Sequence, residues 1–214
     1  GVGLSTELGC TNLLNALDLA GIPLHSDERT MDDPLVLIGG HCAFNPEPVA
    51  DFIDVAVLGD GEEASVELSR IVRDWRLAGG PGGRDGVLEA LAATGGFYVP
   101  RFYDVEYGAD GAIARISPNR DGVPAEVERW VLTDLDAWPY PKEPIVPLAE
   151  TVHERYSAEI FRGCTRGCRF CQAGMITRPV RERSLAAIGA MVDHGLRATG
   201  LEEVGLLSLS SADH

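Results

Sequence analysis

Three of the five cysteines fall within eight residues, and their spacing is typical of a metal-binding loop. Cys164, Cys168 and Cys171 form the pattern C-x3-C-x2-C inside the segment IFRGCTRGCRFCQAG, residues 160–174. Thiolates are soft ligands that favour iron–sulfur clusters, zinc or copper(I). Three sulfurs from one short loop can hold three irons of a cubane cluster, which leaves the fourth iron open to a substrate or cofactor. The sequence therefore predicts an iron–sulfur centre at this loop.

The cysteines lie in a basic segment of an acidic chain. Between Glu159 and Ser184 there are six arginines and two glutamates, although the net charge of the 214 residues is −15. That overall charge disfavours a polyanionic partner, so nucleic acid is not expected. Arg162, Arg166 and Arg169 flank the cysteines and are expected to offset the negative charge of a thiolate-held cluster. The other three are interpreted mainly as surface residues that could also hold an anionic group: Arg178, Arg181 and Arg183.

Two other interpretations of the cysteines stay open. C-x2-C is half of many zinc sites, and His153 or His194 could supply a fourth ligand. The chain has no second C-x2-C, however, and a structural zinc site needs four ligands. Inert buried thiols are the third interpretation, but thiols beside arginines are reactive rather than inert. The remaining cysteines, Cys10 and Cys42, are interpreted as small core residues.

The segment RGCTRGCRFC resembles the cluster loop of the radical S-adenosylmethionine (radical SAM) enzymes, whose pattern is C-x3-C-x-aromatic-C after the first strand of a partial (β/α) barrel. The resemblance implies that the three cysteines ligate a [4Fe-4S] cluster and that the amino and carboxylate groups of SAM bind its fourth iron. It also implies that Phe170, at the aromatic position, contacts SAM near the adenine. Ser210 and Ser211, after the next strand, are implied to lie near the SAM amino group, although the glycine-glycine-glutamate form of that motif is lacking.

The same resemblance implies an enzyme that cleaves SAM reductively and starts radical chemistry on a substrate that the sequence does not identify. Its expected partners are SAM and a reductant protein such as flavodoxin or ferredoxin. No catalytic side chain is assigned. Two alternatives of other classes are a non-catalytic iron–sulfur redox module and a zinc-stabilised interaction protein.

The elements that must carry these residues begin with an α/β pattern. Residues 34–40 (PLVLIGG) and 54–63 (DVAVLGDGEE) are apolar runs closed by glycines, as expected of parallel strands buried on both faces. Helical spacing is found over residues 7–20 and 62–75. This alternation predicts a Rossmann-like, doubly wound parallel sheet. Ligands of such sheets bind at the carboxyl ends of strands, so Gly39 and Gly40 are predicted cofactor contacts.

Residues 38–64 (IGGHCAFNPEPVADFIDVAVLGDGEEA) are similar to the glycine-rich segments of the Rossmann-like domain that precedes many radical SAM domains and is often called cobalamin-binding. The D-x-H-x-x-G motif, whose histidine ligates cobalt in the base-off form, does not occur in the sequence. The resemblance therefore leaves open whether cobalamin is a second cofactor, in which case methyl transfer is the expected reaction.

The rest of the chain is divided by turn residues. Residues 77–96 are rich in glycine, residues 101–117 alternate around GADG as in a β-hairpin, and residues 136–150 form a proline-rich linker. The sequence predicts one β-loop-α-β unit, made of a strand over 158–163, a helix over 184–198 and a strand over 202–210. This unit would be the start of a partial barrel, which needs about six such units. The predicted domains are residues 1–76, 77–150 and 151–214, and both ends are interpreted as cut, so a fragment is expected.

The composition fits a protein of a reducing compartment. Five unevenly spaced cysteines do not suggest a disulfide framework. No apolar run approaches the roughly 18 residues that a membrane span requires, and no signal peptide is recognised. The expectation is a cytoplasmic protein without membrane contact.

Overall fold

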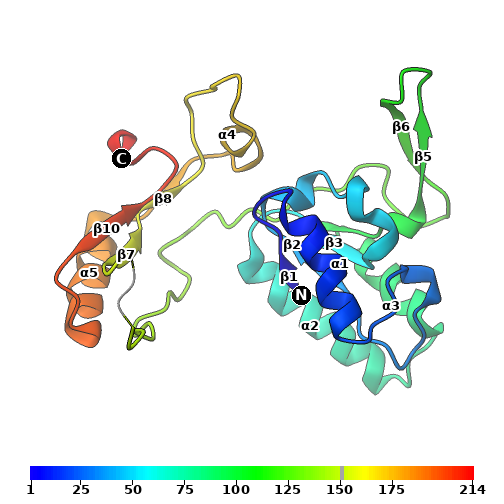
Figure 1. Cartoon of the computed structure of the whole chain (residues 1–214), viewed down its shortest axis with the longest axis horizontal. Coiled ribbons are helices and arrows are strands. Elements are labelled where there is room, and N and C mark those ends of the chain that lie inside the picture. The colour runs from blue at the N-terminus through cyan, green and yellow to red at the C-terminus, as the bar shows by residue number, and fades with distance from the viewer. Residues whose placement is uncertain (150–151) are drawn as a thin grey trace. The chain divides into compact units, whose positions relative to one another are not determined.

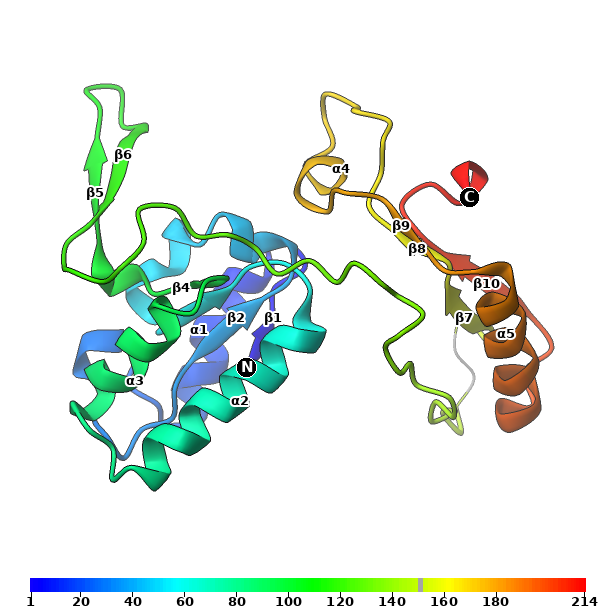
Figure 2. The ribbon, with the colours of Figure 1, turned by 180° about the vertical axis from the view of Figure 1, so that it is seen from behind.

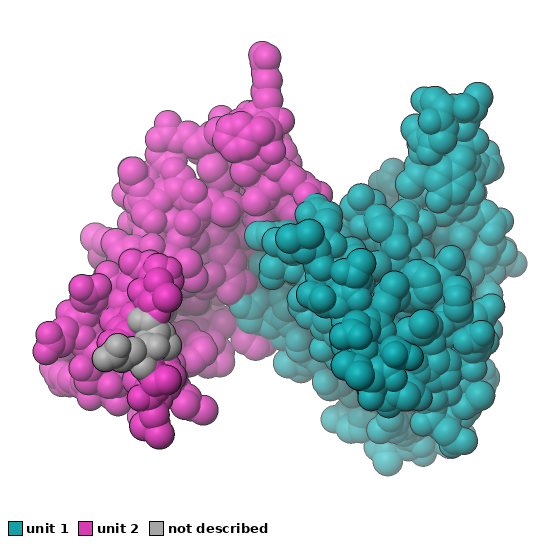
Figure 3. Space-filling model, viewed as in Figure 1, with its two compact units in different colours: residues 1–131 teal, residues 132–214 magenta. Residues whose placement is uncertain are grey.

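The computed structural model describes residues 1–149 and 152–214, which form two compact units, residues 1–131 and residues 132–214 (Figure 3). We call them unit 1 and unit 2. The predicted boundary between residues 150 and 151 lies outside the described residues, and the three-part division stays a prediction. Within the described ranges, no helix has both the length and the apolar character needed to cross a membrane.

Unit 1 is built on a four-stranded sheet with the spatial order β1-β2-β3-β4. The first three strands are parallel and the fourth is antiparallel to β3. The strands are β1 (Val2–Gly3), β2 (Leu37–Gly39), β3 (Val55–Val57) and β4 (Phe97–Tyr98). A mixed α/β architecture with a parallel sheet is thereby confirmed, and it is compatible with a Rossmann-like fold.

Helices cover both faces of this sheet: α1 (Gly9–Leu19) lies on one face and α2 (Gly61–Leu77) on the other (Figures 1 and 2). The spacing that predicted the first helix is the spacing of its buried side chains, Leu13 and Leu17, one turn apart. A third helix, α3 (Gly83–Ala92), lies within the glycine-rich segment and contacts α2 and β4. Short 3-10 helices complete unit 1: η1 (Ser26–Glu28), η2 (His41–Phe44), η3 (Glu47–Phe52) and η4 (Pro100–Phe102).

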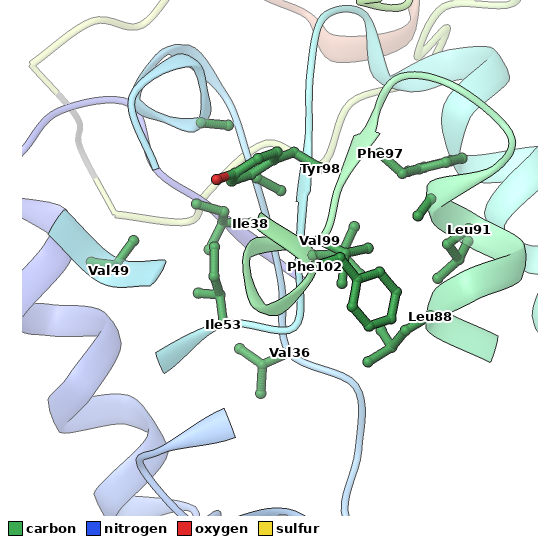
Figure 4. Packing of buried hydrophobic residues seen from close by; sticks show 14 of the residues in the cluster. Val36, Ile38, Val49, Ile53, Leu88, Leu91, Phe97, Tyr98, Val99 and Phe102 are labelled. Carbon is green, nitrogen blue, oxygen red and sulfur yellow. The ribbon is translucent and has the colours of Figure 1, made fainter. Parts of the chain in front are cut away.

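The core of unit 1 gathers side chains from the sheet, α3 and η4 (Figure 4). Phe97, Phe102, Leu88 and Leu91 are fully buried there, together with Ile38 of β2. Burial of each such side chain contributes about 1.5–3 kcal/mol. The core therefore joins the predicted parallel strands to elements that come after residue 76.

One carboxylate is buried beside this core. Asp54 is 1% exposed and its Oδ2 accepts hydrogen bonds from Arg29 Nη1 (3.0 Å), Arg84 Nη2 (2.8 Å) and the backbone N–H of Val36 (2.7 Å). Desolvation lowers the pKa of the Arg29 guanidinium, and the charge of Asp54 opposes that shift. The loop before β2, the start of β3 and the start of α3 are therefore tied together at one buried point.

The predicted hairpin is confirmed. Strands β5 (Tyr103–Tyr107) and β6 (Ile113–Pro118) pair antiparallel. The turn is stabilised by Asp110, whose carboxylate accepts a hydrogen bond from the Ala112 N–H at 3.1 Å.

Unit 2 contains the predicted β-α-β connection. Strands β7 (Tyr156–Glu159) and β10 (Val204–Leu207) pair in parallel, with α5 (Leu185–Thr199) between them in sequence. Ser184 caps the start of this helix, since its Oγ accepts the Ala187 N–H at 3.1 Å, and Gly200 caps its end with φ +73°. A further antiparallel pair is formed by β8 (Phe161–Arg162) and β9 (Arg181–Glu182). The barrel itself stays a prediction.

The strand expected over 158–163 is divided at Ile160. Residues before it pair with β10, and residues after it pair with β9. Tyr156 and Ala158, on alternate positions of β7, form a small core with Met191 of α5. Gly195 makes this packing possible, because a methyl group there would lie 2.2 Å from the Tyr156 ring. Two short helices complete unit 2: α4 (Ala173–Ile176) and η5 (Ser211–Asp213).

Candidate metal centre

The cysteine loop runs from the end of β8 to the start of α4 (Figure 1). Its first bend is at Gly163, which has φ +89°. A methyl group at that position would lie 2.6 Å from the carbonyl oxygen of Pro179, so the close approach of these two chain segments requires glycine. The loop is thus fixed at its entry by the segment that leads into β9.

Cys164 and Cys171 lie close to each other around Gly174. A methyl group at Gly174 would lie 3.6 Å from Cys171 Sγ and 3.8 Å from Cys164 Cβ. Both sulfurs accept backbone hydrogen bonds, Cys171 Sγ from the Gly174 N–H (3.3 Å) and Cys164 Sγ from the Arg166 N–H (3.4 Å). Hydrogen bonds of this kind stabilise negative charge on sulfur and tune the potential of thiolate-held clusters.

Cys168, the middle cysteine, is exposed, and all five cysteines are free thiols. Within residues 1–149 and 152–214, no three side chains of histidine, cysteine, aspartate or glutamate are gathered closely enough to hold a metal ion. The donor set fits a [4Fe-4S] cluster in its chemistry, since it offers three thiols on one loop and two backbone donors to sulfur. The assignment of all three cysteines as ligands stays a prediction.

Two of the three arginines that flank the cysteines have carboxylate partners. Arg162 Nε donates to Glu159 Oε1 at 2.7 Å, and Arg166 Nε donates to Asp213 Oδ2 at 2.7 Å. The second pair raises the pKa of Arg166 and lowers the pKa of Asp213, with their mutual hydrogen bond as the largest cause in both. Arg169 is exposed. The loop is therefore less positive than its arginine count suggests.

The interpretation of Arg181 and Arg183 as surface residues is wrong. They are 8% and 5% exposed. Arg181 donates to the backbone oxygens of Leu132, Thr177 and Pro179 at 3.0–3.2 Å. Because residues i and i+2 of a strand share a face, both arginines of the alternating R-E-R sequence turn inward at β9.

Arg183 joins two parts of unit 2. Its Nη1 donates to the Leu135 carbonyl and its Nη2 to Glu159 Oε2 at 3.2 Å. Glu159, at the end of β7, therefore binds Arg183 and Arg162 together. The side chain of Arg178 is exposed, and its Nε donates to the Gly174 carbonyl at 3.1 Å. This hydrogen bond ties the segment after α4 back to the helix.

The other predicted SAM contacts are Phe170, which is part of the cysteine loop, and Ser210 and Ser211, which follow β10. Phe170 is 91% exposed. Ser210 is the residue before η5, and Ser211 Oγ lies 2.8 Å from Ser208 Oγ. The ion pair between Arg166 and Asp213 joins this segment to the cysteine loop across 47 positions of sequence. Asp213 was not predicted, and a lone aspartate gives no signal of such a pairing.

Gly39 and Gly40, the predicted cofactor contacts of unit 1, lie at the end of β2 and directly after it. Gly40 has φ +90°. A methyl group there would lie 2.7 Å from the carbonyl oxygen of Leu4, so the close neighbour of Gly40 is the chain itself.

Unit 2 also has a cavity of about 480 Å³ beside β7. Tyr140 of the proline-rich segment and Met191 of α5 contribute apolar walls. The polar groups of the lining come from Ser157, Glu159 and Arg183. Its volume falls within the roughly 300–1,000 Å³ of small-molecule sites. The strand that leads to the cysteine loop therefore also lines this cavity.

Two comparisons with known proteins cover different shares of the chain. Residues 1–100 match the family described as "Radical SAM proteins, N-terminal". The chain is also similar to "Uncharacterized protein MJ0966" of Methanocaldococcus jannaschii, with 26% identity over 183 residues, which is 84% of this chain and 32% of that protein. The chain thus spans about a third of the length of this curated relative. The family match supports membership of the radical SAM superfamily.

Proposed function

We propose that this chain is part of a radical SAM enzyme in which Cys164, Cys168 and Cys171 hold a [4Fe-4S] cluster that binds SAM. The observation that carries the proposal is the loop between β8 and α4, with three thiols in the pattern C-x3-C-x2-C and two sulfurs that accept backbone N–H groups. The family match supports it independently, because that match ends at residue 100 and does not include Cys164, Cys168 or Cys171.

When bound and reduced, a cluster of this type supplies the electron that cleaves SAM and yields a 5′-deoxyadenosyl radical. In the proposal the three thiolates ligate iron, and the N–H groups of Arg166 and Gly174 stabilise charge on two of the sulfurs. The flat, exposed ring of Phe170 offers an apolar face for the adenine.

Further polar groups serve SAM and the substrate. The hydroxyls of Ser210 and Ser211 are suited to accept hydrogen bonds from the SAM amino group. The ion pair between Arg166 and Asp213 keeps that segment beside the loop. The cavity beside β7 is our candidate for part of the substrate site, and a one-electron reductant protein such as flavodoxin or ferredoxin is the proposed electron donor.

Anaerobic reconstitution with iron and sulfide tests the ligand set. We expect about four irons per chain and the broad visible absorbance of a thiolate-bound cluster. Cys168→Ala should lose both, and because Cys168 is exposed its replacement leaves the core of unit 2 intact. Cys42→Ala, in unit 1, is the matched control and should keep full iron content. Normal iron content in Cys168→Ala would refute the ligand assignment.

Addition of SAM separates the proposal from its alternatives. We expect SAM to change the electron paramagnetic resonance spectrum of the reduced cluster, and a full-length protein to release 5′-deoxyadenosine in the presence of a reductant. A cluster that does not respond to SAM would indicate a non-catalytic redox module. A colourless protein with one zinc per chain would indicate a zinc-stabilised interaction protein.

A further inference from the structure

A cavity of about 520 Å³ lies in unit 1 and has no part in the proposed function. Its walls come from η1, η3, η4 and β5, the first strand of the hairpin. The three 3-10 helices are held next to one another, because η3 contacts both η1 and η4. The volume falls within the roughly 300–1,000 Å³ of small-molecule sites, so the space is large enough for an organic ligand.

The charged groups on these walls are mainly carboxylates. Asp27, Glu47 and Asp51 line the cavity, and in the part of the chain that the structure describes none of them forms an ion pair. Arg101 also lines the cavity, but its Nη1 donates to Asp85 Oδ1 at 3.0 Å, and Asp85 lies outside the lining. The positive charge of Arg101 is therefore matched elsewhere, and the cavity keeps an excess of negative charge.

Ser26 places a buried hydroxyl in the same walls. This residue is 7% exposed, and its carbonyl accepts a hydrogen bond from Arg101 Nη2 at 2.6 Å. The Oγ of Ser26, in contrast, has no hydrogen-bond partner among the described residues. Buried polar groups are almost always hydrogen-bonded, so this hydroxyl indicates a partner that the chain itself does not supply.

Strand β5 adds aromatic faces to the cavity. Tyr103, Val105 and Tyr107 occupy alternate positions of this strand, and all three line the cavity. The ring of Tyr103 packs against Tyr98 with a centroid distance of 4.7 Å, and the Tyr98 OH donates to Glu47 Oε1 at 2.7 Å. These contacts fix Glu47 and the Tyr103 ring before any ligand binds, and the faces of tyrosine rings attract organic cations.

From this lining we infer that the cavity binds an aliphatic polyamine, an organic cation whose ammonium groups are separated by methylene chains. Carboxylates on two elements, η1 and η3, suit ammonium groups that are spaced apart, and the tyrosines and Val105 suit the methylene chain. A metal ion suits the lining less, because within residues 1–149 and 152–214 no three side chains of histidine, cysteine, aspartate or glutamate are close enough to hold one. The Ser26 hydroxyl is suited to accept a hydrogen bond from an ammonium group. The inference does not depend on the iron–sulfur centre of unit 2.

Calorimetric titration of the 214-residue chain with spermidine tests the inference. We expect saturable binding of one molecule per chain, weakened about tenfold in Asp51→Asn, which loses a charged hydrogen-bond acceptor at the cavity. Asp18→Asn is the matched control, because Asp18 is an exposed aspartate of α1 outside the lining. This control separates the site from the attraction that a net charge of −15 exerts on any polyamine. The absence of saturable binding, or an equal effect of the two changes, would overturn the inference.

Two further measurements test the chemistry of the ligand. Cadaverine, a linear diamine, should bind at least about tenfold more tightly than the uncharged diol of the same length, because only the diamine can pair with the carboxylates. Ser26→Ala should weaken spermidine binding about fivefold and leave the melting temperature unchanged, since the hydroxyl has no partner among the described residues. A diol that binds as tightly as the diamine, or full affinity in Ser26→Ala, would contradict the inference.

Discussion

Replacement of Asp54 by asparagine is the sharpest test of what holds unit 1 together. The change keeps the size of the side chain but removes the charge that Arg29 and Arg84 share at 3.0 and 2.8 Å. The side chains of Arg29 and Asp54 are both 0% exposed, so water cannot take the place of the lost partner. Breaking a buried pair in this way destabilises a protein by about 3–5 kcal/mol, out of a total of about 5–15 kcal/mol.

Urea denaturation followed by tryptophan fluorescence measures this loss, since Trp75 and Trp130 both lie in unit 1. With a slope of about 2 kcal/mol per molar urea, the midpoint of Asp54→Asn should fall by about 1.5–2.5 M. Asp74→Asn is the control, because Asp74 pairs with Arg70 on the exposed face of α2 and such pairs contribute little. If the two variants shift the midpoint equally, the buried network does not stabilise unit 1 as we argue.

Two other changes test packing and titration. Gly195→Ala should destabilise unit 2, because its methyl group would lie 2.2 Å from the ring of Tyr156. Gly189→Ala, on the same helix, is the control, because its methyl group meets nothing within 4 Å. In thermal melts followed by circular dichroism, the control should unfold like the parent protein and Gly195→Ala should unfold at a lower temperature. Burial and the hydrogen bond to Glu47 raise the pKa of the Tyr98 phenol above its ordinary value of about 10. A raised pKa contributes stability that is complete below about pH 10 and is lost as the pH rises further, so Tyr98→Phe should flatten the alkaline part of the stability curve. An unchanged slope in that variant would contradict the assignment.

The sequence was most informative where one local pattern decides the structure. The apolar run that ends at Gly39 became a parallel strand, the helical spacing of Leu13 and Leu17 became a buried stripe, and the GADG turn closed a hairpin. The C-x3-C-x2-C spacing likewise located the loop between β8 and α4. In each case, residues within about one turn or one strand contain the whole signal.

Long-range pairings gave no such signal. Asp54 meets arginines that lie 25 and 30 positions away, and Trp130 covers a glycine some 70 positions before it. The charge of Arg183 predicts a surface residue, whereas its burial depends on Glu159 and the Leu135 carbonyl. Such contacts follow from the topology of the fold rather than from the spacing of residues in one segment.

The lengths of the strands have a consequence for self-association. The outer strands of the sheet in unit 1 are β1 and β4, and each contains only two residues. Edges this short give a foreign strand almost no row of free backbone groups on which to add. In unit 2 the pair of β7 and β10 has four residues in each strand, and Leu206 and Leu207 are more than half exposed. Concentrated solutions should therefore aggregate through unit 2, and a lysine in place of Leu206 should delay the onset of turbidity.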